Sequence, residues 1–155
     1  IVSCSELEKE DLVADLVCKT STGSLWQRNP ENDGFTDLQT RITWFDETRK
    51  SVTWDDTGRY CERKGLTPPT GYPEELNGKN GLPNYDSDFI VADNNGLREV
   101  FPDMRGKYFW SSTWVPGSKF FAFEFGGSTG NVFESVSANG FDIDTARCVR
   151  RPSRE

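Results

Sequence analysis

Short runs of aromatic and branched residues, separated by glycines, dominate the last third of the chain. They occupy residues 108–113, 119–125, 132–136 and 146–150. Runs of this length between turn residues are typical of strands, and the alternation of Phe121, Phe123 and Phe125 with their neighbours suits a strand with one face in the core. We expect an antiparallel sheet here, with these three side chains and Trp110 buried.

The first fifty residues show a different pattern, in which apolar runs flank polar turns. Residues 16–19 and 25–28 bracket a turn that contains Gly23, and this predicts a hairpin. Residues 40–45 and 50–52 are two further expected strands, and the polar stretch 29–37 is expected to be a loop.

Helical signals are few. Ser5 and Glu8 form the sequence signature of a capping box, and a helix beginning there must end early if Cys4 is to approach Cys18. Residues 53–61 have an N-capping Thr and place Trp54, Gly58 and Cys61 on one face of a second helix. Three prolines fix a loop over 66–73, a turn of helix is expected at 74–76, and residues 77–95 are expected to form a long surface loop.

Composition narrows the class of protein. A chain of 155 residues fits one domain, and 11 Phe, 5 Trp and 4 Tyr predict an aromatic core. The net charge of -7 would repel nucleic acid, and no apolar run approaches the roughly 20 residues that span a bilayer. The chain begins at Ile1 without a Met, so we expect a mature or excised fragment whose signal peptide or anchoring region lies outside it.

Four cysteines occur with no histidine and no CxxC spacing, which argues against zinc and for two disulfides formed in an oxidising compartment. We therefore expect an exported protein. Four cysteines allow three pairings, and the spacing alone does not choose among them.

Catalysis has few candidate groups. Without histidine there is no Ser-His-Asp or Cys-His arrangement, and oxidised cysteines supply no thiolate. The paired carboxylates of Asp55 with Asp56, Glu74 with Glu75, and Asp142 with Asp144 leave one enzymatic alternative, the hydrolysis of carbohydrate by two acids. Neighbouring acids on an acidic chain are more often solvated surface, so we expect no enzyme activity.

Five motifs in order support a resemblance to a known family. They are Leu-Trp-Gln at 25–27, the Trp54 to Cys61 helix, the proline-rich approach to Glu-Glu-Leu at 66–76, Tyr-Phe-Trp-Ser-Ser-Thr at 108–113 and Arg-Cys-Val-Arg at 147–150. Over roughly residues 25–151 the chain resembles the bacterial Lcl domain, also called DUF1566. That resemblance implies an α+β, C-type-lectin-like fold related to formylglycine-generating enzyme and to the variable proteins of diversity-generating retroelements. Gly58 replaces the usual Ala, Thr-Pro-Pro-Thr at 67–70 replaces the usual Leu-Pro-Thr, and the N-terminal residues lie outside the match.

The resemblance also implies the disulfide pairing and the domain boundary. In the family, the cysteine of the second helix pairs with one near the C-terminus, which here are Cys61 and Cys148. Cys4 then pairs with Cys18. Residues 1–20 are expected to form a connector with a lead-in helix and first strand, and residues 21–155 the C-type-lectin-like domain.

The expected ligand face follows the Trp-Ser-Ser strand, as in the retroelement proteins. Aromatic rings beside Asn, Asp, Glu and Ser suit a sugar, whose C–H face stacks while its hydroxyls hydrogen-bond. The candidate binding residues are Trp114, Lys119, Glu124, Asn131, Phe133, Glu134, Ser137, Asn139, Phe141 and Asp142. Trp114, next to Pro116 and Gly117 in an expected turn, is the most informative of them.

Metal and anion sites are weaker hypotheses. Calcium is the one cofactor left open, but the C-type-lectin triplets Glu-Pro-Asn and Gln-Pro-Asp are absent, and the nearest triplet is Phe101-Pro102-Asp103. Alternating acids at 86–88 and 142–144 more often satisfy their own turns. The arginines at 147, 150, 151 and 154 could grip anionic envelope polymers, but we expect a solvated strand and tail.

The sequence therefore predicts a non-enzymatic recognition or adhesion domain at the bacterial cell surface, which binds a cell-surface glycan or protein at the tip of a larger exported protein. Nucleic acid is not an expected partner and membrane insertion is not expected. We expect self-association, with a trimer as the expected form, because the tips of fibres are often trimeric. The alternatives are the carbohydrate-active enzyme and a purely structural capping or assembly domain.

Overall fold

A computed structural model of the chain describes residues 1–50, 61, 85–105, 108–115, 119–124, 131–137 and 145–150. For residues 85–87, 108, 111–115, 119–124, 131–137 and 145 the description covers the backbone path and strand pairing. Within these residues the fold is α+β, with one mixed sheet, a few short helices and two disulfides.

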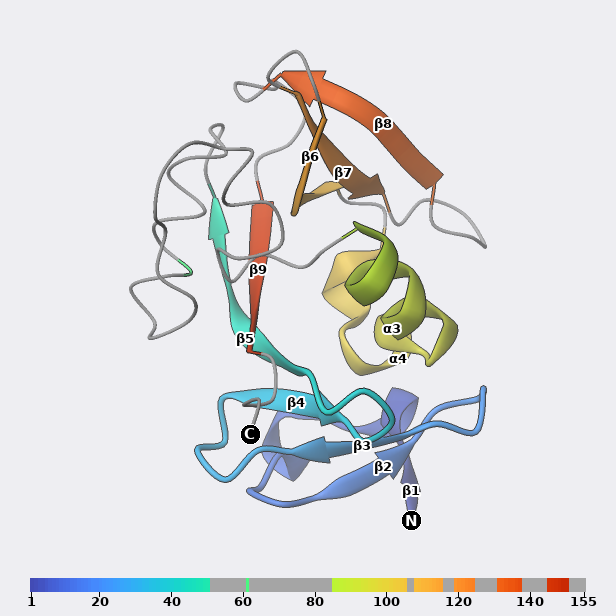
Figure 1. Cartoon of the computed structure of the whole chain (residues 1–155). Helices are drawn as coiled ribbons and strands as arrows, with labels where there is room; N and C mark the ends of the chain where they lie inside the picture. Colours follow the sequence, from blue (N-terminus) through green and yellow to red (C-terminus); the bar gives the residue numbers. More distant parts are fainter. Residues whose placement is uncertain are drawn as a thin grey trace, which may run out of the picture.

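The sheet has nine strands in the order β1-β2-β3-β4-β5-β9-β6-β7-β8. Most neighbours are antiparallel, as expected, but β1 pairs with β2 and β6 pairs with β9 in parallel. In Figure 1, β1 to β4 lie at the bottom and β6 to β8 at the top, with β5 and β9 side by side between them. The strands are β1 Val2–Ser3, β2 Val17–Lys19, β3 Leu25–Arg28, β4 Gly34–Asp37, β5 Thr43–Lys50, β6 Tyr108–Val115, β7 Lys119–Glu124, β8 Asn131–Ser137 and β9 Thr145–Arg150.

The short helices lie beside the sheet. The N-terminal segment contains two 3-10 turns, and a second helical segment follows at residues 85–104, where α3 and α4 lie next to each other (Figure 1). The elements are η1 Cys4–Glu6, η2 Lys9–Asp11, the π-helix η3 Tyr85–Ile90, α3 Val91–Asn94, α4 Leu97–Val100 and η4 Pro102–Met104.

The predicted hairpin is confirmed as β2 and β3. Cys18 pairs with Trp26 across the two strands, and the Gly23 N–H donates to the Thr20 carbonyl at 3.0 Å to close the turn. Gly23 has a φ of +89°, in the left-handed region that favours glycine. The strands expected in the last third are confirmed as β6, β7, β8 and β9.

Several local predictions were wrong. Residues 34–37, expected to belong to a loop, form β4, because Phe35 is buried and pairs with Trp44 on β5. The strand expected at 40–45 begins later and is longer, as β5, which runs without interruption from Thr43 to Lys50. Residues 51 and 52 of the second expected strand lie outside the described residues.

Residues 85–95, expected to be part of a long surface loop, are largely helical. Phe89 and Asp88 are buried there, and Ala92 joins the core, so this segment covers the sheet. The Asn and Asp content suggested a loop, whereas the burial of the apolar residues stabilises short helices.

The capping box predicted from Ser5 and Glu8 is also wrong in position. No side-chain cap is present at η1, and the box falls at η2, where the Glu8 N–H donates to Oδ2 of Asp11 at 3.0 Å. The expected early end of the helix is confirmed, since η1 has only three residues and the chain can then bring Cys4 to Cys18.

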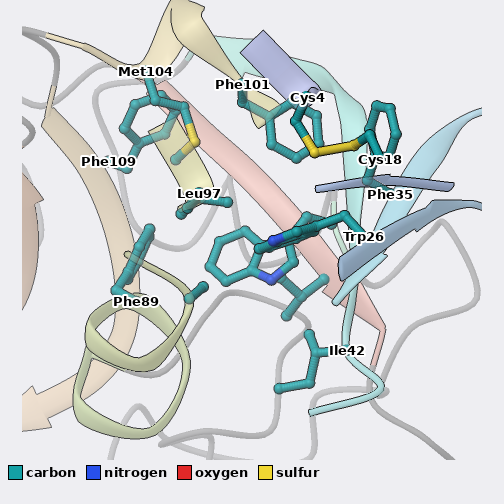
Figure 2. Close-up of a cluster of buried hydrophobic side chains, with 13 residues drawn as sticks. Cys4, Cys18, Trp26, Phe35, Ile42, Phe89, Leu97, Phe101, Met104 and Phe109 are labelled. Carbon is teal, nitrogen blue, oxygen red and sulfur yellow. A yellow bond between two sulfur atoms is a disulfide. The ribbon is translucent and has the colours of Figure 1, made fainter. Parts of the chain in front are cut away.

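Aromatic side chains form the core between the helical segment and the sheet (Figure 2). The ring centroids of Trp44 and Phe89 are 5.4 Å apart, and those of Phe35 and Phe101, which pack edge to face, are 5.9 Å apart. Trp110 is fully buried, which confirms its predicted place in the core. The side chains of Phe121, Phe123 and Phe125 lie outside the described part.

Both disulfides have the predicted pairing. Cys4 is bonded to Cys18 and Cys61 to Cys148, and the Cα atoms are 4.9 and 5.3 Å apart. Residues 1–20 contribute two strands to the common sheet and Cys4 and Cys18 to the core, while the domain boundary at residue 20 stays a prediction. Of the helix predicted at 53–61, only Cys61 is described, and it is helical. The predicted loop of 66–73 and the turn of 74–76 lie outside the described residues.

Candidate functional site

Seven of the ten predicted binding residues lie on three adjoining strands. Trp114 is on β6, Lys119 and Glu124 are the ends of β7, and Asn131, Phe133, Glu134 and Ser137 are on β8. Asn139, Phe141 and Asp142 lie outside the described residues. The sheet therefore brings together residues that are up to 23 positions apart in the sequence, from 114 to 137.

The strand register places five of these seven positions at two ends of the three-stranded segment, while Phe133, opposite Ala122, and Glu134 lie between them. At one end Lys119 pairs with Ser137, and Trp114 pairs with Phe120 next to them. At the other end Glu124 pairs with Asn131. Since a strand rises about 3.3 Å per residue, positions 119 and 124 are about 17 Å apart along β7. A small ligand would contact one end rather than both.

A second region with polar side chains lies where β5 meets β9. The pairing of these strands shifts between Trp44 and Thr48, so residues 45–47 bulge away from the ladder. Arg147 on β9 fills this gap, because its Nη1 donates to the Phe45 carbonyl at 2.7 Å and to the Asp46 carbonyl at 2.9 Å.

The same guanidinium contacts η4. Its Nη2 donates to Oδ2 of Asp103 at 2.6 Å, and the group lies 4.1 Å from the centroid of the Phe101 ring. The Arg147 side chain is only 1% exposed, so the solvated strand expected for the C-terminal arginines is wrong at this position. Arg150 is exposed and lies over the Phe45 ring, while residues 151 and 154 are outside the described part.

Burial lowers the pKa of the Arg147 guanidinium below its ordinary value, and the carboxylates of Asp103 and Asp46 oppose that shift. An arginine begins from so high a pKa that it stays charged at neutral pH. The site therefore holds a permanent buried cation whose charge is balanced from the surface.

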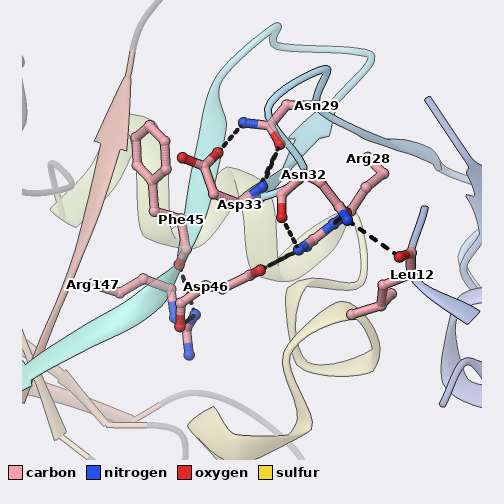
Figure 3. A network of polar contacts seen from close by, with 9 residues as sticks. Leu12, Arg28, Asn29, Asn32, Asp33, Phe45, Asp46 and Arg147 are labelled. Atoms are coloured by element: carbon pink, nitrogen blue, oxygen red, sulfur yellow. Dashed lines mark hydrogen bonds and ion pairs between the residues drawn. The ribbon is translucent and has the colours of Figure 1, made fainter. Parts of the chain in front are cut away.

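A second buried arginine, Arg28 on β3, lies on the other side of Asp46 (Figure 3). Its two Nη atoms contact the two carboxylate oxygens of Asp46, with Nη1 to Oδ1 at 2.7 Å, and its Nε donates to Oδ1 of Asn32 at 2.7 Å. Asp46 thus joins the two arginines, since its carboxylate accepts from Arg28 and its carbonyl from Arg147.

Two clefts open beside this network. The first, which we call the Asp103 cleft, has a volume of about 480 Å³ and lies between the N-terminal segment and residues 99–103. Asp46, Asp103 and Arg147 contribute to it together with mainly apolar side chains. Its volume is within the range of small-molecule sites.

The second, the Arg98 cleft, has a volume of about 570 Å³ and shares Ser5 and Glu99 with the first. Its charges are largely paired: Arg98 Nε donates to Oδ1 of Asp93 at 2.9 Å, and both oxygens of Glu99 accept from the backbone N–H and hydroxyl of Ser21. These contacts fasten α4 to the turn between β2 and β3.

Metal and catalytic candidates find little support in the described part of the chain. Among these residues no three acids, cysteines or histidines gather as a metal site, and Asp103, of the nearest lectin-like triplet, is paired with Arg147. Asp88 is buried. The acid pairs at 55–56, 74–75 and 142–144 lie outside the described residues, so calcium and acid catalysis stay untested there. No described helix has the length and apolar character needed to cross a membrane.

Sequence reasoning missed the two arginines as buried groups. A signal was present for Arg28, because it lies two residues after the buried Trp26 and strand alternation places both on one face. The bulge opposite Arg147 has no comparable signal.

No family model matches the chain, and no curated protein or solved structure matches it either. The fold and its covalent links define the class directly, as an α+β protein with a mixed sheet and two disulfides.

Proposed function

We propose that this chain is an extracellular recognition domain of C-type-lectin-like type, which binds a cell-surface glycan or protein and is displayed on a larger exported protein. The observation that supports it best is the placement of seven predicted binding positions on β6, β7 and β8. Two disulfides support an oxidising compartment, and the described part holds no free cysteine.

The register favours the end of the sheet at Trp114, Lys119 and Ser137 as the binding end. Lys119 and Ser137 pair directly, so these two positions belong to one face of the sheet, whereas Trp114, which pairs with Phe120, belongs to the other face of the same end. A ligand that wraps this end of the sheet would use the aromatic ring for stacking and the ammonium group and hydroxyl for hydrogen bonds. At the opposite end Glu124 pairs with Asn131 and with Tyr108, and the nearest aromatic residue among the predicted binding positions is Phe133, which pairs with Ala122.

A glycan array with the oxidised domain tests this proposal, with and without EDTA. For a glycan that binds, Trp114→Ala and Ser137→Ala should each weaken affinity, by about tenfold for Trp114→Ala, which corresponds to loss of roughly 1.4 kcal/mol. Asn131→Ala, at the far end, is the matched control and should change affinity less than twofold.

Each variant is first compared with the parent by near-UV circular dichroism and urea unfolding. Equal losses in all three variants would contradict a site at one end of the sheet. If no glycan binds, the result favours a protein ligand or a structural capping or assembly role. A large apolar interface between copies of the chain would favour the structural role over a protein ligand. Loss of binding in EDTA would restore calcium as a cofactor.

A further inference from the structure

The Asp103 cleft combines an apolar wall with carboxylates at its mouth. Six of its lining residues are apolar or aromatic, Leu7, Leu12, Phe35, Val100, Phe101 and Pro102. They come from the N-terminal segment, from β4 and from residues 100–102, where α4 ends and η4 begins. Such a wall favours an aliphatic or otherwise apolar stem over a fully polar ligand.

The polar groups of the cleft are chiefly hydrogen-bond acceptors. Its charged side chains are four carboxylates and two cations, and one of those cations, Arg147, directs Nη1 to two carbonyls and Nη2 to Asp103. The other, Lys9, is on the exposed 3-10 turn η2. Arg147 Nε has no hydrogen-bond partner among the described residues, but four carboxylates outnumber the two cations, so the lining favours an ammonium or guanidinium group over an anion.

Two of the carboxylates are exposed and already held in place. The side chains of Asp46 and Asp103 are 40% and 51% exposed, and each is bonded to an arginine that is almost completely buried. A carboxylate fixed in this way loses little conformational entropy when it accepts a further donor. Both lie beside the Arg147 guanidinium, since Asp46 contacts it through its carbonyl and Asp103 through its carboxylate.

We propose that the Asp103 cleft binds the cationic side chain, lysine or arginine, of a protein partner. The aliphatic stem packs on the wall formed by Leu12 and Val100, and the charged head donates to Asp103 and Asp46 at the mouth. This site is separate from the predicted ligand face on β6 to β8, so either site can fail without the other.

The test is an ¹H–¹⁵N NMR titration of the oxidised domain with N-acetyl-arginine amide and N-acetyl-lysine amide. N-acetyl-citrulline amide, which has the shape of the arginine probe without its charge, is the control ligand. We expect saturable shifts at the amides of residues 46, 99–101 and 103, with a Kd on the order of 1–10 mM for the cations, as befits single side chains. Citrulline should bind at least about fivefold more weakly.

Asp103→Asn should weaken binding of the arginine probe about fivefold, because it removes the charge and keeps an oxygen for Arg147. Glu31→Gln removes the same charge at an exposed position outside both clefts and should leave the Kd unchanged. The proposal is overturned if the parent domain shows no saturable shifts, if citrulline binds as well as arginine, or if both variants weaken binding equally.

Discussion

The N-terminal strands and the junction of β5 with β9 are each stabilised by one disulfide and one buried arginine. The residues that these interactions join are much farther apart in the sequence at the junction. In the N-terminal region, residues 1–37, a disulfide links positions 14 apart, and Arg28 bonds to Asn32, which is 4 positions away. Arg28 also bonds to Asp46 on β5, which is 18 positions away. At the junction, the disulfide links positions 87 apart, and Arg147 bonds to Phe45 across 102 positions and to Asp103 across 44.

The difference matters because closing a long loop costs more chain entropy than closing a short one. A disulfide that closes a long loop therefore removes more conformational entropy from the unfolded chain than one that closes a short loop. A hydrogen bond that closes a long loop cannot be replaced by neighbouring residues in the sequence. We expect the junction to be the more sensitive region, and two pairs of matched substitutions measure the difference.

The largest effect is expected from the disulfides. Replacing both Cys61 and Cys148 by Ala should lower the free energy of unfolding by about 4.6 kcal/mol, whereas the same change at Cys4 and Cys18 should lower it by about 3 kcal/mol, from the chain-entropy relation. Urea unfolding of the two double variants measures both values. A larger loss from the N-terminal pair would reverse the comparison and would indicate that local packing outweighs loop length.

The arginines give the second pair. Arg147→Met keeps the stem but leaves the Phe45 and Asp46 carbonyls of the bulge without their donor, so the free energy of unfolding should fall by about 3 kcal/mol. Arg28→Met should cost only about 2 kcal/mol, because its partners Asn32 and Asp46 are exposed and water replaces the guanidinium.

A double-variant cycle separates the carbonyl contacts from the ion pair. Asp103→Asn alone should cost less than about 1 kcal/mol, since this carboxylate is half-exposed. Chemical unfolding of the single and double variants supplies the coupling energy. If Asp103→Asn costs as much as Arg147→Met, the ion pair and not the bulge contact is the important interaction.

The same division explains which features could be predicted from the sequence. The β2–β3 hairpin follows from local signals, since Gly23 lies in the turn and apolar residues flank it. The strands of the last third follow from their aromatic runs, and the cysteine pairing from the resemblance.

The errors fall where distant contacts overrule a local preference. Asn and Asp residues around Phe89 indicate a loop, but the ring packs on Trp44, which is 45 positions away. Likewise Gly34 indicates a turn, but the segment is a strand because Phe35 pairs with Trp44 on β5. Arg147 is next to Cys148 in a strand buried on both faces, and its partners come from the bulge of β5 and from Asp103 on η4.

For the candidate site, the sequence identifies residues and the strand register arranges them. Residue type does not indicate which end of the sheet each candidate belongs to, because Trp114, Lys119, Ser137, Glu124 and Asn131 are all of types found on ligand-binding faces. Pairing across β7 assigns them to opposite ends. A register depends on where bulges fall, and the shifts after Trp110 and after Phe120 have no sequence signature.

The smallest expected difference comes from two glycines with nearly the same backbone conformation. Gly23 and Gly96 have φ values of +89° and +90°, so alanine at either position is strained by about 1 kcal/mol. Around Gly23 no atom lies within 4 Å of an added Cβ, whereas at Gly96 it would meet the Thr20 side chain at 2.5 Å. Gly23→Ala therefore measures the backbone strain alone. Gly96→Ala measures the backbone strain together with the steric clash with Thr20, which is 76 positions away.

Gly96→Ala should lower the free energy of unfolding by about 2 kcal/mol, against about 1 kcal/mol for Gly23→Ala, because Thr20 must move away from the helical segment. Thr20 donates to the Asn95 carbonyl at 3.1 Å, as does Nε1 of Trp26 at 2.9 Å, so its displacement disturbs the attachment of α4 to the first hairpin. Adding Thr20→Ser to Gly96→Ala removes the methyl group and should recover part of the loss while leaving the hydroxyl. Urea unfolding of these three variants and of the parent protein measures the losses in free energy of unfolding. Equal losses at the two glycines would mean that Thr20 adjusts without cost.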